Sequence, residues 1–313
     1  MQGKPYFITA IATPLQEDDT LHAAGLERLI DDQFQAGIDG LLIGGTMGAM
    51  QLLTAETYRG LVERSLEFAR GRGELLVGAG DVSFARTQAR IAFLNTLPVD
   101  GVVVLPPYFL SFSPEELRDY YLALAEESKA PLYLYDLPQI TKVKLSLETV
   151  CELAEHPNIR GIKCSDEPTY ARQLIDLVGD RLRVIMAAPL MLDVFLRQGI
   201  AEHLDGVFCL YPRPLVALGC AAQQQAWETV SSLQREMNGV VRLLRAYGVW
   251  QPFTALMNAL GVPGRMKPRP HRQWDAAETE AFLQDAETQK VLRFLRGAEA
   301  PSFAVVAEGR VVC

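Results

Sequence analysis

The sequence predicts an α/β fold, a closed (β/α)8 TIM barrel with additional C-terminal helices. Eight short segments are apolar almost throughout, which is typical of strands that helices cover on both faces. The segments between them carry apolar residues at helical spacing. Eight alternating strands and helices fit a chain of 313 residues, 49% of which are hydrophobic, and favour a parallel barrel.

The predicted strands share a short length and a nearly continuous apolar character. "PLYLYDLP" and "IRGIKCS" show the pattern, and these two runs place Tyr135 and Lys163, side chains able to do chemistry, near their ends. The predicted strands are 7–12, 40–45, 74–80, 101–107, 131–138, 159–165, 182–188 and 205–211.

The predicted helices carry apolar stripes and recognisable starts. One stripe contains Leu26, Leu29, Ile30 and Phe34. Two further stripes consist of Leu147, Val150, Cys151 and Ala154, and of Ala171, Leu174, Ile175 and Val178. Ser or Thr precedes acidic residues in "TAETY", "SPEEL" and "SLETV", which predicts helix N-termini at these places.

We expect the barrel to span 1–220 and a helical extension packed on it to span 221–297. The tail, 298–313, has no clear assignment. The alternative is an open doubly wound sheet, which often carries a dinucleotide fingerprint. "GGTMGA" and "VGAGDVS" both fall short of that G-x-G-x-x-G pattern, and Ser83 stands where the last Gly of the second would be.

Composition narrows the class of partner. The net charge is −8, with both signs mixed along the chain, so nucleic acid and membrane surfaces are not expected partners. No apolar run approaches a transmembrane span, and the first residues lack the order of a signal peptide. Five scattered cysteines without a C-x-x-C pair indicate reduced thiols in a cytoplasmic protein.

Lys163 is the candidate nucleophile. Of the seven lysines, only Lys163 lies inside an apolar strand, near the end where barrel enzymes place their catalytic groups. The two-residue period of a strand puts Gly161 on the same face, where it would leave space below the amine. Burial without a carboxylate would favour an amine that attacks a carbonyl carbon. The alternative is an ordinary lysine that pairs with Asp166 or Glu167 or reaches solvent.

Tyr135 ends the preceding predicted strand, with Tyr133 one layer deeper on the same face. A phenol at the mouth of a barrel can move a proton to or from a carbonyl or hydroxyl oxygen. The alternative is a core tyrosine whose hydroxyl bonds to the backbone.

The second predicted strand ends in "GGTMG", residues 44–48. Glycines permit a turn that aims successive N–H groups at one point, which forms an anion-binding nest, and Thr46 adds a hydroxyl. The alternative is an ordinary glycine-rich turn.

Metal and cofactor chemistry are not expected. The four histidines neither end predicted strands nor form a ligand pair at helical spacing; they are His22, His156, His203 and His271. Asp81, Asp136 and Asp166 lie just past strand ends, where solvated or loop-capping roles are common. Cys164 is expected to pack outward.

Together these segments resemble the dihydrodipicolinate synthase / N-acetylneuraminate lyase family of pyruvate-dependent class I aldolases, from about residue 7 to 269. "GGTMGAMQLLTAETY" resembles its G-T/S-T-G-E segment, and "PPYFLSFSPEEL" its P-x-Y-Y segment. "YLYDLP" and "GIKCSD" resemble its Y-N-x-P and G-x-K-D/x-S segments, and "GVPGRMKPRP" resembles its closing G-x-x-x-G-x-x-(R/K)-x-P.

The resemblance implies a Schiff base between Lys163 and a 2-oxo acid, usually pyruvate, with Tyr135 as proton shuttle. It implies that the N–H groups of Thr46 and Met47 hold the carboxylate of the substrate, and that Thr46 hydrogen-bonds Tyr135. The expected substrate-binding residues are Gly45, Thr46, Met47, Tyr108, Phe109 and Phe208. An aldehyde is the expected second substrate, and a homodimer or homotetramer the expected assembly.

The sequence also departs from the family pattern. Met47 replaces a hydroxyl residue, Ala49 a glutamate, and Phe109 a tyrosine that a neighbouring subunit contributes in the synthase. Asp136 replaces Asn, and "QIT" supplies Gln139 and Ile140 where the synthase has an arginine.

The leading hypothesis is therefore an aldolase or dehydratase acting on 2-oxo acids such as 2-keto-3-deoxy sugar acids. A true dihydrodipicolinate synthase, a non-catalytic binding relative and a metal-dependent barrel enzyme are the alternatives.

Overall fold

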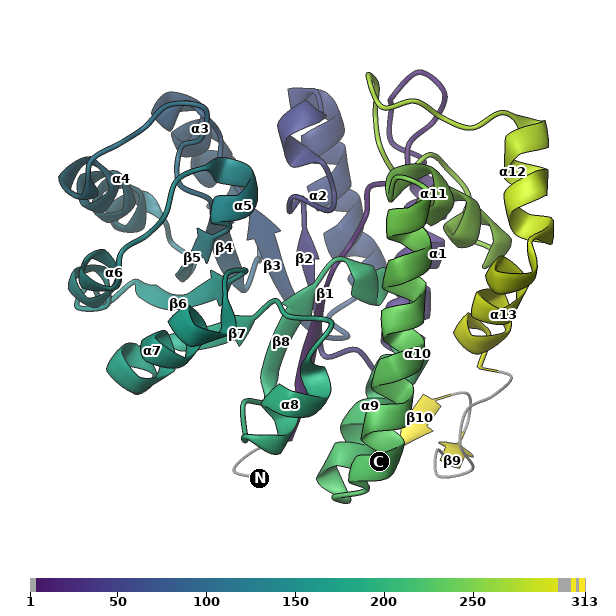
Figure 1. The fold of residues 1–313 in the computed structure, drawn as a ribbon. Helices are drawn as coiled ribbons and strands as arrows, with labels where there is room; N and C mark the ends of the chain where they lie inside the picture. Colours follow the sequence, from purple (N-terminus) through teal and green to yellow (C-terminus); the bar gives the residue numbers. More distant parts are fainter. Residues whose placement is uncertain (1–3, 298–304, 308–309, 313) are drawn as a thin grey trace. The chain divides into compact units, whose positions relative to one another are not determined.

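The computed structural model describes residues 4–297, 305–307 and 310–312, and its eight parallel strands close into a barrel in chain order (Figure 1). This confirms the predicted fold class. The strands are β1 (Tyr6–Ala10), β2 (Gly40–Ile43), β3 (Glu74–Gly78), β4 (Gly101–Val104), β5 (Leu132–Asp136), β6 (Ile159–Cys164), β7 (Arg183–Met186) and β8 (Glu202–Asp205).

Helices follow the strands, and their starts agree with the sequence. Thr54, Ser113 and Ser146 each accept a hydrogen bond from the backbone N–H three residues later, so the predicted N-termini are confirmed. The helices are α1 (Ala23–Ala36), α2 (Ala55–Ala69), α3 (Phe84–Leu94), α4 (Pro114–Glu127), α5 (Pro138–Thr141), α6 (Leu147–Leu153), α7 (Pro168–Val178), α8 (Leu192–Arg197), α9 (Pro212–Gln223), α10 (Trp227–Ala246), α11 (Trp250–Ala259), α12 (Ala276–Gln284) and α13 (Ala286–Leu295), with 3₁₀ turns η1 (Met50–Leu52) and η2 (Val207–Leu210).

The strands supply much of the core. Every residue of β2, β4 and β5 is buried, so these strands are covered on both faces. That burial is the reason their sequences are nearly continuous in apolar residues.

The chain forms two compact units. The first unit contains the chain up to Gly73, Pro189–Ala201 and the chain from Asp205 onward, and the second contains Glu74–Ala188 and Glu202–Leu204. In the first unit, α10 packs along α9 (Figure 1), and α1 packs against α2 and α9. In the second, β5 and β6 pair, and α4 packs against α3 and α6. The boundaries predicted at 220 and 297 stay predictions.

The predicted eighth strand, 205–211, is wrong. The strand ends at Asp205, and most of the apolar run that follows forms the 3₁₀ turn η2, in which Phe208, Cys209 and Leu210 are buried. A short apolar run fits a strand and a buried helical turn equally well, so hydrophobicity alone does not separate them.

The tail contributes two paired strands that the sequence did not predict. Strands β9 (Val305–Ala307) and β10 (Arg310–Val312) pair antiparallel. The rest of 298–313 lies outside the described residues.

Cys151, Cys164 and Cys209 are free thiols, as predicted, but Cys220 is disulfide-bonded. The expectation of reduced thiols is therefore wrong for Cys220, because an odd count without C-x-x-C does not exclude pairing between distant positions. Within the described ranges, no helix combines the length and the apolar character needed to cross a membrane.

Candidate active site

Tyr135 and Lys163 lie side by side at the ends of two paired strands. The register of β5 and β6 places Tyr135 opposite Lys163 and Tyr133 opposite Gly161. Both side chains are buried, with 6% of Tyr135 and 4% of Lys163 exposed. The Nζ atom of Lys163 lies 3.9 Å from the centre of the Tyr135 ring. The structure thus brings together the two residues with the clearest predicted chemistry.

The amine of Lys163 has a polar but uncharged partner. Its Nζ donates a hydrogen bond to Ser165 Oγ at 2.7 Å. Among the described residues, no ion pair joins it to a carboxylate, and Asp166 pairs instead with Lys144 at 2.7 Å. Glu167 is the N-cap residue of α7. The alternative of an acid-paired or solvated Lys163 is therefore contradicted.

The space beneath Lys163 is filled. A Cβ atom at Gly161 would lie 2.6 Å from two ring atoms of Tyr133, and a Cβ at Gly101 would lie 2.6 Å from the opposite edge of the same ring. The expectation that Gly161 leaves open space is therefore wrong, because the larger Tyr133 occupies it. The two glycines hold this ring one layer below Tyr135.

Asp136, the last residue of β5, anchors the segment that follows the strand. Its carboxylate accepts a hydrogen bond from the Leu145 N–H at 3.1 Å and pairs with Lys144. Burial raises the pKa of Asp136, and the neighbouring ammonium of Lys144 only partly opposes that rise. The ammonium thus bridges Asp136 and Asp166, and Gln139 Nε2 donates to Asp166 at 3.3 Å.

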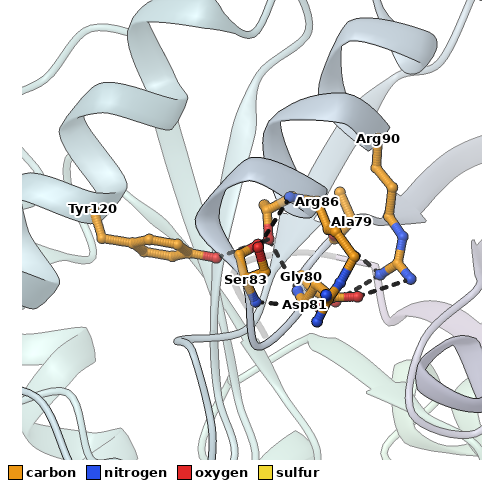
Figure 2. Close-up of polar contacts among 8 residues, drawn as sticks. Ala79, Gly80, Asp81, Ser83, Arg86, Arg90 and Tyr120 are labelled. Carbon is orange, nitrogen blue, oxygen red and sulfur yellow. Dashed lines mark hydrogen bonds and ion pairs between the residues drawn. The ribbon is translucent and has the colours of Figure 1, made fainter.

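A second charged cluster follows β3 (Figure 2). Asp81 pairs with Arg86 at 2.7 Å and with Arg90 at 3.1 Å. Burial pushes the pKa of Asp81 upward, but hydrogen bonds from Arg86 and from the Ser83 N–H, with the charge of Arg90, hold it below its usual value. This cluster caps the β3 connection, which agrees with the loop-capping role expected for Asp81.

Tyr108 and Phe109, which follow β4, differ in their surroundings. Burial raises the pKa of Tyr108 to about 12, so its hydroxyl stays protonated at neutral pH. Phe109 has φ +85° and is 90% exposed. A non-glycine residue rarely adopts this conformation, and it directs a large apolar side chain into solvent. Their substrate-binding roles stay predictions.

In the first unit, residues 44–48 form a tight turn after β2. Gly44 has φ +61°, and the Thr46 carbonyl accepts a hydrogen bond from the Ala49 N–H at 3.1 Å. Thr13 Oγ1 donates to the Gly48 carbonyl at 2.6 Å. Gly45 is buried and Thr46 is half-buried. The expected nest is thus a rigid turn, although carboxylate binding by it stays a prediction.

Met47 and Phe208 have definite places in the first unit. The Met47 side chain packs on Gly206, where a Cβ atom would lie 2.6 Å from Met47 Cγ. Phe208 is fully buried and contacts the rings of Phe7 and Tyr211, with ring centres 6.3 and 6.2 Å away. Phe208 therefore belongs to the aromatic core, and its predicted contact with substrate stays a prediction.

Sequence reasoning assigned no role to two lysines near these residues. Lys144 neutralises Asp136. The replacement of the family Asn by Asp136 could have indicated that a cation lies nearby. Lys267 is 5% exposed, and its Nζ donates to the Thr46 carbonyl at 3.1 Å. The sequence offered one indication for Lys267, which is that it lies in the family-like segment "GVPGRMKPRP". It was passed over because that segment contains no predicted strand.

A closed parallel barrel with ionisable side chains at the ends of several strands defines a barrel enzyme. The chain belongs to the Dihydrodipicolinate synthetase family, whose sequence profile it matches over residues 5–288. It is accordingly a lyase of the class I aldolase type.

Among curated relatives, the 4-hydroxy-tetrahydrodipicolinate synthase of Exiguobacterium sp. AT1b is 30% identical over 254 residues, which cover 81% of this chain and 87% of the relative. Two solved structures share the fold. The 4-hydroxy-tetrahydrodipicolinate synthase of Methylacidiphilum fumariolicum SolV has a TM-score of 0.82 at 23% identity, over 94% of this chain and 99% of the other. The N-acetylneuraminate lyase of Proteus mirabilis has a TM-score of 0.84 at 18% identity, over 92% of this chain and 99% of the other.

Proposed function

We propose that this protein is a Schiff-base-forming lyase, an aldolase or dehydratase, acting on pyruvate or a related 2-oxo acid. The observation that carries this proposal is the environment of Lys163. A buried amine bonded to a hydroxyl, with an aromatic face beside it, has no carboxylate among the described residues to keep it as a permanent ion pair. Such an amine is suited to attack a carbonyl carbon.

In the proposed reaction, the neutral Lys163 amine adds to the C2 carbonyl of the 2-oxo acid, and water leaves to give a protonated imine. The imine accepts the electron pair released when the adjacent C3–H or C3–C4 bond breaks, which forms an enamine. Tyr135 carries protons to and from the oxygen that leaves or reacts. Its place opposite Lys163 in the β5–β6 register supports this role.

Thr46 and Met47 are the proposed carboxylate-binding residues. They follow β2, and strand ends of a parallel barrel face its catalytic mouth. Their backbone N–H groups lie in the rigid turn 44–48, which Thr13 holds at the Gly48 carbonyl. N–H groups can bind an anion by hydrogen bonding without a cationic side chain in direct contact with it.

The second substrate is proposed to be an aldehyde without a carboxylate that needs pairing, such as the aldehyde released from a 2-keto-3-deoxy sugar acid. The α5 segment offers Gln139 and Ile140, and Gln139 is already bonded to Asp166. Lys144 in the same region is neutralised by Asp136 and Asp166. The relatives named as synthases make dihydrodipicolinate synthase activity the main alternative.

The test of the mechanism is reductive trapping. Incubation with pyruvate and borohydride should add one reduced adduct per chain, which peptide mass spectrometry should place on Lys163. Lys163→Ala should abolish the adduct, whereas Lys144→Ala and a metal chelator should not. Trapping at another lysine, or none with a panel of 2-oxo acids, would overturn the mechanism and favour the non-catalytic binding relative.

We also infer a cytoplasmic homodimer or homotetramer. In the second unit, exposed apolar side chains lie on the connections after β3 and β4 and at the start of α3; they include Val82, Phe84, Phe109 and Leu110. Beside them lies a cavity of about 350 Å³ that Phe84, Pro107 and Phe112 help to line. A surface of this kind marks an interface, and a second copy is the occupant we propose. Sedimentation should show an oligomer that Phe109→Asp with Leu110→Asp converts to a monomer; a wild-type monomer would contradict this.

A further inference from the structure

Lys267 is a buried lysine that the proposed mechanism does not use. It lies in the first unit, in the segment between α11 and α12, and only 5% of it is exposed. Its Nζ atom lies 3.8 Å from the centre of the Trp250 ring and 3.1 Å from the Thr46 carbonyl oxygen. No ion pair with a carboxylate is found for it within 4–297. Burying an unpaired ammonium is costly, so its position calls for a function.

The two contacts of Lys267 favour the charged amine. An ammonium is attracted to the face of an indole ring, and it donates strongly to a carbonyl oxygen. Burial lowers the pKa of Lys267 to about 8, so at neutral pH most of the protein still carries the charge. The charge disappears as the pH rises above about 8.

The peptide that Lys267 contacts is the one that presents the Met47 N–H. In a planar trans peptide, the C=O and N–H bonds point in opposite directions. A donor that fixes the Thr46 carbonyl on one side therefore fixes the Met47 N–H on the other. Polarisation of the carbonyl by a cation also strengthens the N–H as a donor. The Ala49 N–H, 3.1 Å from the same oxygen, holds the carbonyl on the same side.

We propose that Lys267 is a positioning residue for carboxylate binding, which acts through the Thr46–Met47 peptide and supplies positive charge behind the turn 44–48. The proposal rests on the proposed function, because it assigns to this turn the carboxylate of the 2-oxo acid. It makes affinity for the anion, rather than the chemistry at Lys163, the property that Lys267 controls.

The other ionisable groups nearby do not reproduce this behaviour. Arg265 and Arg269 are both engaged by Asp19. The ring centre of His271 lies 6.3 Å from that of Trp250, and no hydrogen bond joins this imidazole to the Thr46 carbonyl among the described residues. Measurements at pH 7.5 and 9.5 lie on either side of the pKa of Lys267, so this lysine changes charge between them.

The test uses the pyruvate concentration that half-saturates borohydride trapping on Lys163. Wild type is compared with Lys267→Met, Lys267→Arg and the control Lys290→Met, which makes the same chemical change at an exposed site on α13. Loss of a charged hydrogen bond should raise the half-saturating concentration about tenfold or more at pH 7.5 in Lys267→Met. The limiting amount of adduct should be unchanged, and the thermal unfolding midpoint should not fall.

The half-saturating pyruvate concentration of Lys267→Met, divided by that of wild type, should approach one at pH 9.5, because the wild-type lysine is then neutral. Lys267→Arg should resist the rise in pH, since arginine stays charged. A ratio within twofold of one at pH 7.5, or a ratio equal at both pH values, would overturn the proposal, the second by indicating a purely structural role. If Lys267→Arg does not fold, the proposal is judged from the pH dependence of the Lys267→Met to wild-type ratio. Absence of trapping in wild type and Lys290→Met as well would overturn the proposed function itself.

Discussion

Tyr135 and Lys163 divide the proposed work between a proton carrier and a nucleophile. Their side chains come from facing positions of β5 and β6, with the Lys163 amine beside the Tyr135 ring. Strands position such groups more rigidly than loops do. The two roles should therefore be separable by substitution.

Tyr135→Phe is expected to lower turnover by about 10²–10⁴-fold while leaving pyruvate trapping on Lys163 largely intact, since positioned acid–base groups contribute this much. Turnover and trapping should be measured on the same preparation. Tyr121→Phe is the control, because the buried hydroxyl of this α4 residue donates to the Val104 carbonyl at 3.1 Å, away from Lys163. An equal loss of trapping and turnover would assign Tyr135 a positional role.

The segment from α5 to Leu145 depends on one buried carboxylate. Asp136 accepts the Leu145 N–H, and Lys144 joins it to Asp166 at the start of the next connection. These contacts fold the chain back over the end of β5. The ammonium of Lys144 compensates the charge of Asp136, which explains how a carboxylate is buried at this position.

Lys144→Met should lower the free energy of unfolding by about 1–3 kcal/mol at pH 7, because it leaves a buried carboxylate without its cation. The pKa of Asp136 is already raised by burial, and loss of the ammonium raises it further. A group whose folded pKa is raised binds a proton more readily when folded, so the deficit should shrink as the pH falls from 7 to 5. Urea unfolding at both values measures this, and a deficit that grows on acidification would contradict it.

The short helix α5 is expected to deny the protein efficient synthase activity. It presents Ile140, 63% exposed, where a synthase carries a cation for the carboxylate of its aldehyde. A site without the paired group discriminates strongly against the substrate that needs it. Condensation of pyruvate with aspartate semialdehyde should therefore be very slow, and Ile140→Arg should increase it. Robust wild-type condensation would establish the alternative function.

Three strands of the second unit are joined by one arginine. Arg183 at the start of β7 donates to Glu202 of β8 at 2.7 Å and to Glu74 of β3 at 2.5 Å. Burial opposes its charge, but the two carboxylates more than offset this and raise the pKa of Arg183. The pair of glutamates would repel each other without it.

Arg183→Met is expected to cost about 3 kcal/mol of unfolding free energy, because it leaves two partly buried carboxylates facing each other. Chemical denaturation at pH 7 should show this loss. Arg172→Met removes an exposed pair with Asp176 on α7 and should change stability by less than about 0.5 kcal/mol. Equal effects of the two substitutions would show that the Arg183 cluster adds no special stability.

The barrel could be predicted because strands such as β2, β4 and β5 are buried on both faces, so their sequences are almost entirely apolar. Strand order put Tyr135 and Lys163 at the ends of successive predicted strands, and the family resemblance implied that they act together. The contact of Lys267 with Thr46 could not be predicted, since it joins residues 221 positions apart through a carbonyl that any residue carries. The end of β8 was misplaced for a similar reason: η2 is buried like a strand, and its backbone path leaves no distinct pattern in the sequence.

The ring of Tyr133, held between Gly101 and Gly161, restricts the order in which this barrel can change over evolution. Either glycine could acquire a side chain only after the tyrosine had been replaced by something smaller, because a Cβ at each position would overlap the ring. The three positions should therefore be inherited as a set. To open space beneath Lys163, a protein designer should first replace Tyr133 with a smaller residue and change the two glycines afterwards.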